Sequence, residues 1–127
     1  MKLEMVHSDD APKAVGPYSQ AIRVGNMIYS SGQIGLNPQT GAMVGESVEV
    51  QTQQVLENLD AVLMAAGSHR SKIVKATIFL QNMTDFSVIN GIYATWLGDH
   101  RPARATVEVS ALPLGALIEI DVIASVD

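Results

Sequence analysis

The sequence contains no cysteine and few charged residues. Without cysteine, the 127-residue chain can form no disulfide, no thiolate zinc site and no cysteine nucleophile. Charged residues make up 17% of the chain, below the roughly 25% of an average soluble domain, whereas apolar residues make up 47%. A small chain with so few charges is predicted to cover part of its surface with copies of itself.

Positive charge is scarce and scattered. Eight Lys and Arg residues against 13 Asp and Glu give a net charge of −5. Nucleic-acid binding needs clustered cations, so no nucleic-acid partner is expected. No apolar run approaches the ~20 residues of a membrane span, and residues 1–7 lack a signal-peptide core. We therefore expect a single domain over residues 1–127, in the cytoplasm and without membrane contact.

The apolar pattern predicts an α+β fold. Helical spacing of apolar residues predicts two helices. The first ends before Gly67, and the second begins near Thr84 or Asp85 and ends at Gly98. Alternating or β-branched runs predict strands over residues 21–24, 27–31, 73–80, 104–110 and 117–124. This order predicts one mixed sheet with both helices packed on one face.

Two polar residues in the second half of the chain have both a structural and a functional interpretation. Asn90 falls on the apolar side of the second predicted helix, where a buried amide needs hydrogen-bond partners. A structural bond to a loop and a site role are equally plausible there. Arg104 opens a strand, where arginine is usually solvated or salt-bridged, but its fork could also bind a carboxylate. If the chain is extended from Arg101 onward, the two arginines face opposite sides of the sheet, and at most one lines a given pocket.

A third polar residue, Glu119, stands in a strand with Asp121 two residues on. The pattern alone favours a half-exposed strand whose polar side chains face the solvent. The functional alternative is a carboxylate that positions a water or transfers protons. His7, His69 and His100 lack ligand spacing, so no metal site is predicted. The chain also has no Gly-x-Ser-x-Gly motif and no phosphate loop, which disfavours a Ser-His-Asp hydrolase.

Four segments together resemble the RidA family of YjgF-like reactive intermediate (imine) deaminases. They are Gly16-Pro17-Tyr18-Ser19-Gln20-Ala21, Ser31-Gly32-Gln33-Ile34, Arg101-Pro102-Ala103-Arg104-Ala105-Thr106-Val107-Glu108-Val109 and Ile118-Glu119-Ile120-Asp121. The likeness covers nearly the whole chain in order, and the first and third segments together are highly specific. It implies a chorismate-mutase-like fold and a homotrimer with a pocket at each subunit interface. It also implies hydrolysis of C=N bonds without a cofactor or metal.

The resemblance further implies a substrate class and site residues. Family members deaminate reactive 2-imino and enamine acids, such as 2-aminoacrylate, 2-iminopropanoate and 2-iminobutanoate, to 2-oxo acids and ammonia, as metabolite damage control. By position, Arg104 matches the arginine that binds the substrate carboxylate, and Glu119 matches the acid that orients the attacking water. The remaining matches line the substrate pocket: Tyr18, Ser31, Gly32, Asn90 and Thr106.

Two positions depart from the family's usual pattern. Thr106 stands where the family often has Cys. That position is expected to face the ligand through its backbone, so the deaminase prediction is kept. Asn82 stands where Asp is common, and no function is attached to it.

Two alternative functions stay open beside the deaminase. One is a non-catalytic module of the same fold that binds 2-oxo acids as a regulatory subunit or sensor. The other is a nucleolytic or translation-inhibiting activity, also ascribed to relatives, which the net negative charge disfavours. Imine hydrolysis itself needs only a held carboxylate and a positioned water, plus a general acid–base worth roughly 10²–10⁴-fold.

Overall fold

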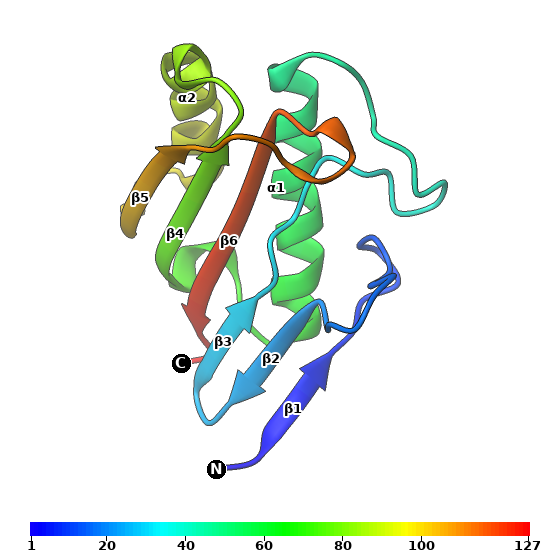
Figure 1. Ribbon diagram of the computed structural model, residues 1–127. Helices are drawn as coiled ribbons and strands as arrows, with labels where there is room; N and C mark the ends of the chain where they lie inside the picture. The colour runs from blue at the N-terminus through cyan, green and yellow to red at the C-terminus, as the bar shows by residue number, and fades with distance from the viewer.

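The computed structural model describes residues 1–127 as a six-stranded mixed sheet with two helices on one face (Figure 1). The strands lie in the order β1-β2-β3-β6-β4-β5, and only the β4–β5 pair is parallel. The elements are β1 (Leu3–Val6), β2 (Ala21–Val24), β3 (Met27–Ser30), α1 (Val48–Ala65), β4 (Ile73–Leu80), α2 (Phe86–Leu97), β5 (Ala103–Glu108) and β6 (Ile118–Ser125). The predicted α+β layer arrangement is confirmed.

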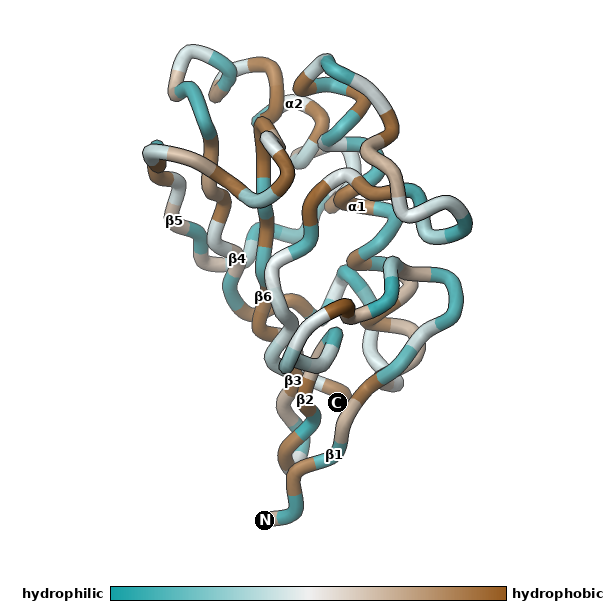
Figure 2. The backbone as a smooth tube through the Cα atoms, turned by 45° about the vertical axis from the view of Figure 1, so that its right-hand side comes forward, coloured by the Kyte–Doolittle hydropathy of each residue, from teal (hydrophilic) through white to brown (hydrophobic).

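The core lies between the helices and the facing side of the sheet. Alternate residues of β6, from Ile118 through Ile120 to Val122, are buried there, and α1 meets them with Leu59 and Leu63. Burial of each such side chain contributes about 1.5–3 kcal/mol. Figure 2 shows hydrophobic and hydrophilic residues alternating along the strands, as expected when a sheet has one covered face.

The helix boundaries agree with the sequence at α1 and differ at α2. Ser47 caps α1 by accepting a hydrogen bond from the Val50 N–H, and Gly67, with φ of +82°, follows the end of the helix. Asp85 precedes α2 but makes no capping bond with its side chain. Instead, Asn82 caps a short 3-10 turn by accepting from the Thr84 N–H at 3.0 Å. Asn82 therefore has a structural role that the sequence did not indicate.

Three buried carboxamides hold the irregular segments to the layers. Gln20 binds the backbone of the segment between β1 and β2, and Gln51 joins the 45 and 117 regions. Asn58 is fully buried on α1 and donates to the Ile34 and Leu36 carbonyls at 3.3 and 3.0 Å. These bonds replace the backbone pairing that loops lack. They fix the segments that carry Tyr18, Ser31 and Gly32.

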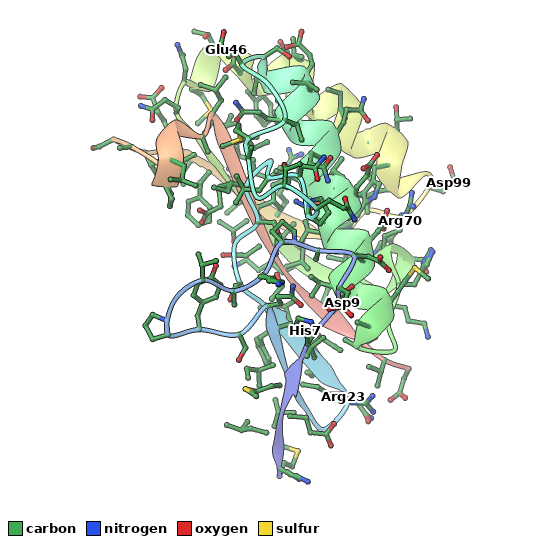
Figure 3. The ribbon with its side chains drawn as sticks, turned by 90° about the vertical axis from the view of Figure 1, so that its right-hand side faces the viewer. His7, Asp9, Arg23, Glu46, Arg70 and Asp99 are labelled. Atoms are coloured by element: carbon green, nitrogen blue, oxygen red, sulfur yellow. The ribbon has the colours of Figure 1, made fainter.

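The second face of the sheet has no helix over it, and we call it the open face. Figure 3, which views the molecule from the side, shows the β1–β2 segment (blue) and the 3-10 turn Pro113–Gly115 (orange) extending away from the helices. By register, the open face carries several apolar side chains: Leu3, Met5, Ile22, Tyr29, Phe79, Ala105, Val107 and Ile123. Several of them are largely exposed, which marks an interaction surface. No helix of the chain is long and apolar enough to cross a bilayer.

Replacing Asn58 with leucine tests the role of the buried amides. Leucine keeps the approximate volume but cannot donate to the two loop carbonyls, so Asn58→Leu is expected to lower the free energy of unfolding by about 2 kcal/mol. Urea denaturation measures the change. Gln53→Leu is the matched control, because Gln53 is exposed on the same helix and its loss should change stability by less than about 0.5 kcal/mol. Equal stability of the two variants would contradict this account of Asn58.

Candidate functional site

Arg104 is held by side chains of α2 at the edge of the sheet. It lies on β5, beside Ala76 of β4, and so points to the face that the helices cover. Its guanidinium lies 5.3 Å from the Phe86 ring and 5.4 Å from the Tyr93 ring. Its Nη1 donates to Asn90 Oδ1 at 2.5 Å. Spacings of four and three residues along α2 place these three partners on one side of the helix.

The Asn90 partner explains why an amide interrupts the apolar stripe of α2. An aspartate at this position would neutralise the guanidinium, whereas the neutral amide orients it and leaves its positive charge available. Each aromatic ring adds a cation–π attraction of about 0.5–1 kcal/mol at an exposed site. The arrangement therefore fixes an arginine in place without cancelling its charge, as binding of an anion requires.

A cavity of about 360 Å³ adjoins Arg104 between α2 and the start of β5. Its lining residues are Asn90, Tyr93, Ala94, Leu97, Arg101, Pro102 and Arg104. The prediction that Arg101 and Arg104 cannot share a pocket is wrong. Strand β5 begins at Ala103, so Arg101 lies outside it and the alternation of strand faces does not govern its direction.

Two buried hydroxyls next to Arg104 have no hydrogen-bond partner. They are Tyr93 Oη and Thr106 Oγ1. Thr106 shares the face of β5 with Arg104, as the sequence predicts. Burial raises the pKa of the Tyr93 hydroxyl, and the charges of Arg104 and Arg101 oppose that rise. Unpaired buried hydroxyls are uncommon in proteins. These two therefore indicate that a hydrogen-bonding partner, which the single chain does not supply, belongs at this place.

Glu119 lies on the open face, in a second group of predicted site residues. Its neighbour in the register is Phe79 of β4, which in turn pairs with Val107 of β5. Gly32 comes so close that a Cβ there would overlap the Glu119 carboxylate, so only glycine leaves room for that side chain. The contact places Gly32 and the carboxylate in one small site.

Ser31 precedes Gly32 and is hydrogen-bonded to the segment that carries Tyr18. The Ser31 N–H donates to the Gln20 carbonyl at 2.9 Å, and Ser31 Oγ donates to the Ser19 carbonyl at 2.6 Å. These bonds fasten the end of β3 to the segment that carries Tyr18, whose side chain is 52% exposed. An exposed aromatic ring is suited to form one wall of a binding site.

The environment of Glu119 favours its protonated form. Burial raises the pKa of the Glu119 carboxyl, and the nearby negative charge of Asp121 raises it further. Burial also raises the pKa of Asp121, against the effects of a hydrogen bond from Thr77 and of the Lys75 charge. A carboxyl with a raised pKa can give and take protons nearer neutral pH, which is the property of a general acid–base.

The two groups do not meet within one chain. Arg104 shares a row of the sheet with Ala76 and Val122 on the helix side, whereas Glu119 is on the open face. Strand β4 separates their strands, which are therefore about 10 Å apart, and the two residues also lie three rows apart along the sheet. Their side chains point in opposite directions. A single chain thus presents an arginine half-site (Arg104, Asn90 and Thr106) and a carboxylate half-site. In the second, Glu119 contacts Gly32, and Ser31 links them to the segment that carries Tyr18.

Sequence analysis missed three residues that lie beside these half-sites. Phe86 and Tyr93 belong to an apolar stripe and gave no sign that they pack on an arginine. Asp121 was noted only as a neighbour, although its two-residue separation from Glu119 places both carboxylates on one strand face. No three His, Asp or Glu side chains lie close enough together to hold a metal ion.

Comparison with known proteins places this geometry among related chains. Residues 8–126 match the family described as Endoribonuclease L-PSP. The chain is 50% identical over 125 residues to Reactive Intermediate Deaminase A, chloroplastic, of Arabidopsis thaliana, covering 98% of this chain and 67% of that protein. It is 47% identical over 121 residues to a RutC family protein of Pyrococcus horikoshii, covering 95% and 96% of the two chains.

Solved structures agree with the sequence comparison. A crystal structure of the Rid-family protein YyfA from Yersinia pestis, described as a protein of unknown function, superposes with a TM-score of 0.96 and 52% identity. The superposition covers 98% of this chain and 99% of that chain. The fold of the whole chain is therefore shared with that protein.

Removing the charge of Asp121 tests the electrostatics of the carboxylate half-site. In Asp121→Asn the like charge is gone, so the pKa of Glu119 is expected to fall toward the ordinary glutamate value. A ¹³C NMR titration of the side-chain carboxyl carbons measures it. Glu57→Gln, an exposed change on α1, is the control and should leave the Glu119 titration unchanged. A Glu119 midpoint that stays the same in Asp121→Asn would refute the coupling.

Proposed function

The chain belongs to the Endoribonuclease L-PSP family, the YjgF/RidA proteins, and on that premise we propose that it hydrolyses reactive 2-imino acids. The products are a 2-oxo acid and ammonia. The observation that carries the proposal is the Arg104 guanidinium, which is fixed by α2 through a neutral amide and two rings with its charge uncancelled. A 2-imino acid offers the carboxylate that such a group binds.

Arg104 acts on the substrate by orienting it. Two parallel N–H···O bonds from the fork hold the substrate carboxylate and so fix the plane of the adjoining C=N bond. Orientation of this kind supplies several kcal/mol of the barrier reduction in reactions between held partners. A protonated imine is already a strong electrophile, so positioning is a large share of what an enzyme has to add.

Glu119 supplies the proton transfers. Its carboxylate takes a proton from the water that attacks C2 of the protonated imine, and a carbinolamine forms. The protonated carboxyl then gives that proton to the amine nitrogen, and the C–N bond breaks. The carbinol oxygen becomes the carbonyl as its proton passes to the regenerated Glu119 carboxylate. Ammonia departs with the electron pair of that bond. A raised pKa suits Glu119 to both steps.

The complete site requires two subunits of a homotrimer. Arg104 and Glu119 lie on opposite faces of one sheet, so the two half-sites come together only if neighbouring chains each contribute one. The open face supports such an assembly because it exposes apolar side chains. Leu114 supports it as well: this leucine is 75% exposed and has a φ of +56°, a strained state that contact with a neighbour would stabilise.

An RNA substrate, which the family description names, fits this chain less well. The net charge is −5, and neither half-site gathers the cations that neutralise a phosphate backbone. The Arg104 cavity is about 360 Å³, a volume in the range of small-molecule sites. A non-catalytic module that binds 2-oxo acids would use the same arginine, and it differs from the deaminase only in what Glu119 does.

Substitution of each half-site separates binding from catalysis. Arg104→Ala is expected to weaken 2-oxo acid binding by roughly 10–100-fold and to abolish assisted hydrolysis, since the carboxylate loses its partner. Glu119→Gln should keep 2-oxo acid binding but lose about 10²–10⁴-fold in rate. The assay generates 2-aminoacrylate from serine with a dehydratase and follows pyruvate release. Calorimetry measures binding, and Glu57→Gln is the control.

Each result in this pair has a different meaning. If the wild type binds 2-oxo acids but gives no rate above spontaneous hydrolysis, the binding-module function is correct. If Glu119→Gln hydrolyses as fast as the wild type, Glu119 is not the general acid–base. RNA cleavage that is equal with and without Arg104 would indicate a contaminating nuclease.

Mixed trimers test whether the site is shared between chains. Inactive Arg104→Ala and Glu119→Gln chains, unfolded and refolded together in equal amounts, should recover about one quarter of the wild-type rate. An interface is intact only when a Glu119→Gln chain supplies the arginine half-site and an Arg104→Ala chain supplies the carboxylate half-site. In a random cyclic assembly of equal amounts, this holds for about one interface in four. Light scattering should give three times 13.6 kDa for each sample. Absence of recovery in mixed trimers of the correct mass would show that the site does not cross the interface.

A further inference from the structure

Two arginines share one cavity, and neither has an acidic partner. The chain has four arginines, and only Arg70 forms an ion pair with a carboxylate, that of Asp60 at 2.8 Å. Arg101 and Arg104 both line the 360 Å³ cavity between α2 and β5, and no Asp or Glu lines it. In a chain with 13 acidic residues, two uncancelled cations at one cavity repel one another unless an anion occupies it.

Backbone and amide groups hold both guanidiniums in place. Arg101 Nη1 donates to the Gly98 carbonyl at 2.6 Å and to the His100 carbonyl at 2.8 Å. Arg104 Nη1 donates to Asn90 Oδ1. In each case the Nε and Nη2 edge of the fork has no hydrogen bond within the chain. That edge is the one that binds a carboxylate through two bonds.

The two charges act on the same spot. Tyr93 lines the cavity, and its hydroxyl has no hydrogen-bond partner. Burial raises the pKa of this hydroxyl, and the charges of Arg104 and Arg101 both act against that rise. The cavity lining also includes three apolar residues, Ala94, Leu97 and Pro102. A short methylene chain with a negative group at each end matches a cavity of this composition.

We propose that the site prefers 2-imino acids whose side chain ends in a second carboxylate, with Arg104 binding the carboxylate next to C2 and Arg101 binding the distal one. The assignment of Arg104 rests on the proposed function, and the role of Arg101 is additional to it. Three residues of chain separate the Cα atoms of Arg101 and Arg104 by at most about 10 Å, so the two forks can approach a small dianion from different positions. Arg101 is thereby a specificity-determining residue.

A structural role for Arg101 makes a different prediction. Its bonds to carbonyls just beyond the end of α2 stabilise that end of the helix. If this were its whole role, replacing Arg101 would lower the melting temperature and would affect mono- and dicarboxylate ligands equally. The ratio of the two affinities therefore separates the roles.

The test compares 2-oxoglutarate with 2-oxopentanoate, which has the same carbon skeleton without the distal carboxylate. The oxo acids are the stable products of the corresponding imines. Wild-type trimer is expected to bind 2-oxoglutarate roughly 10–100-fold more tightly in calorimetry at low salt. In Arg101→Gln the ratio should fall to about one. Arg23→Gln is the matched control, because Arg23 lies at the far end of α1, near Ala66, and its loss should leave the ratio unchanged.

The outcomes distinguish this inference from the proposed function. Equal affinity for the two oxo acids in the wild type, or a preference that survives Arg101→Gln, overturns the role of Arg101 and leaves the deaminase proposal intact. If neither oxo acid binds the wild type, the role of Arg104 fails, and with it the proposed function. A preference that disappears in Arg101→Gln while thermal unfolding shows a folded protein supports the inference.

Discussion

The alternation of side chains across a β-sheet is the constraint on which the site depends. Successive residues of a strand point to opposite faces of the sheet. On β5 the polar residue of interest faces the helices, and on β6 it faces the open side. On β5 the functional arginine points toward the helices, whereas on β6 the core takes Ile118 and Ile120 and leaves Glu119 on the open face. One chain can stabilise each group well, but it cannot bring them together. In the proposed deaminase, assembly and catalysis are therefore linked by the geometry of one sheet.

Arg70 and Arg104 show how the chain separates a neutralised charge from an uncancelled one. Arg70 donates to both oxygens of Asp60, and the Trp96 indole donates to the same carboxylate. Figure 3 shows Arg70 on the helical side of the molecule, away from the open face. That charge is neutralised and serves packing. Arg104 is packed on rings in a similar way, but its partner is an uncharged amide. The choice of Asn over Asp decides which guanidinium can bind an anion.

Much of the layer arrangement was predictable, because it follows from local pattern. The strand over 73–80 and the helix stop at Gly67 agree with the structure. Strand β1 was missed because its side chains are mostly exposed and only its pairing with β2 defines it. The face of the sheet to which Arg104 points depends on the parallel register with β4. The residues that surround it depend on how α2 packs. Neither long-range fact is encoded in the residues near position 104.

The open face also gives the carboxylate half-site a property that depends on assembly. Glu119 is half-buried in the single chain, and burial is the main cause of its raised pKa. In the proposed trimer a neighbouring chain would remove more water from this face, which raises the pKa of a carboxyl further. The same contact would bring the arginine half-site of the neighbour near Glu119, and that positive charge would lower the pKa. In the trimer, the neighbouring chain thus adds two opposing effects to the burial and the Asp121 charge that already act on Glu119 in the single chain. The balance of all four sets its protonation at neutral pH.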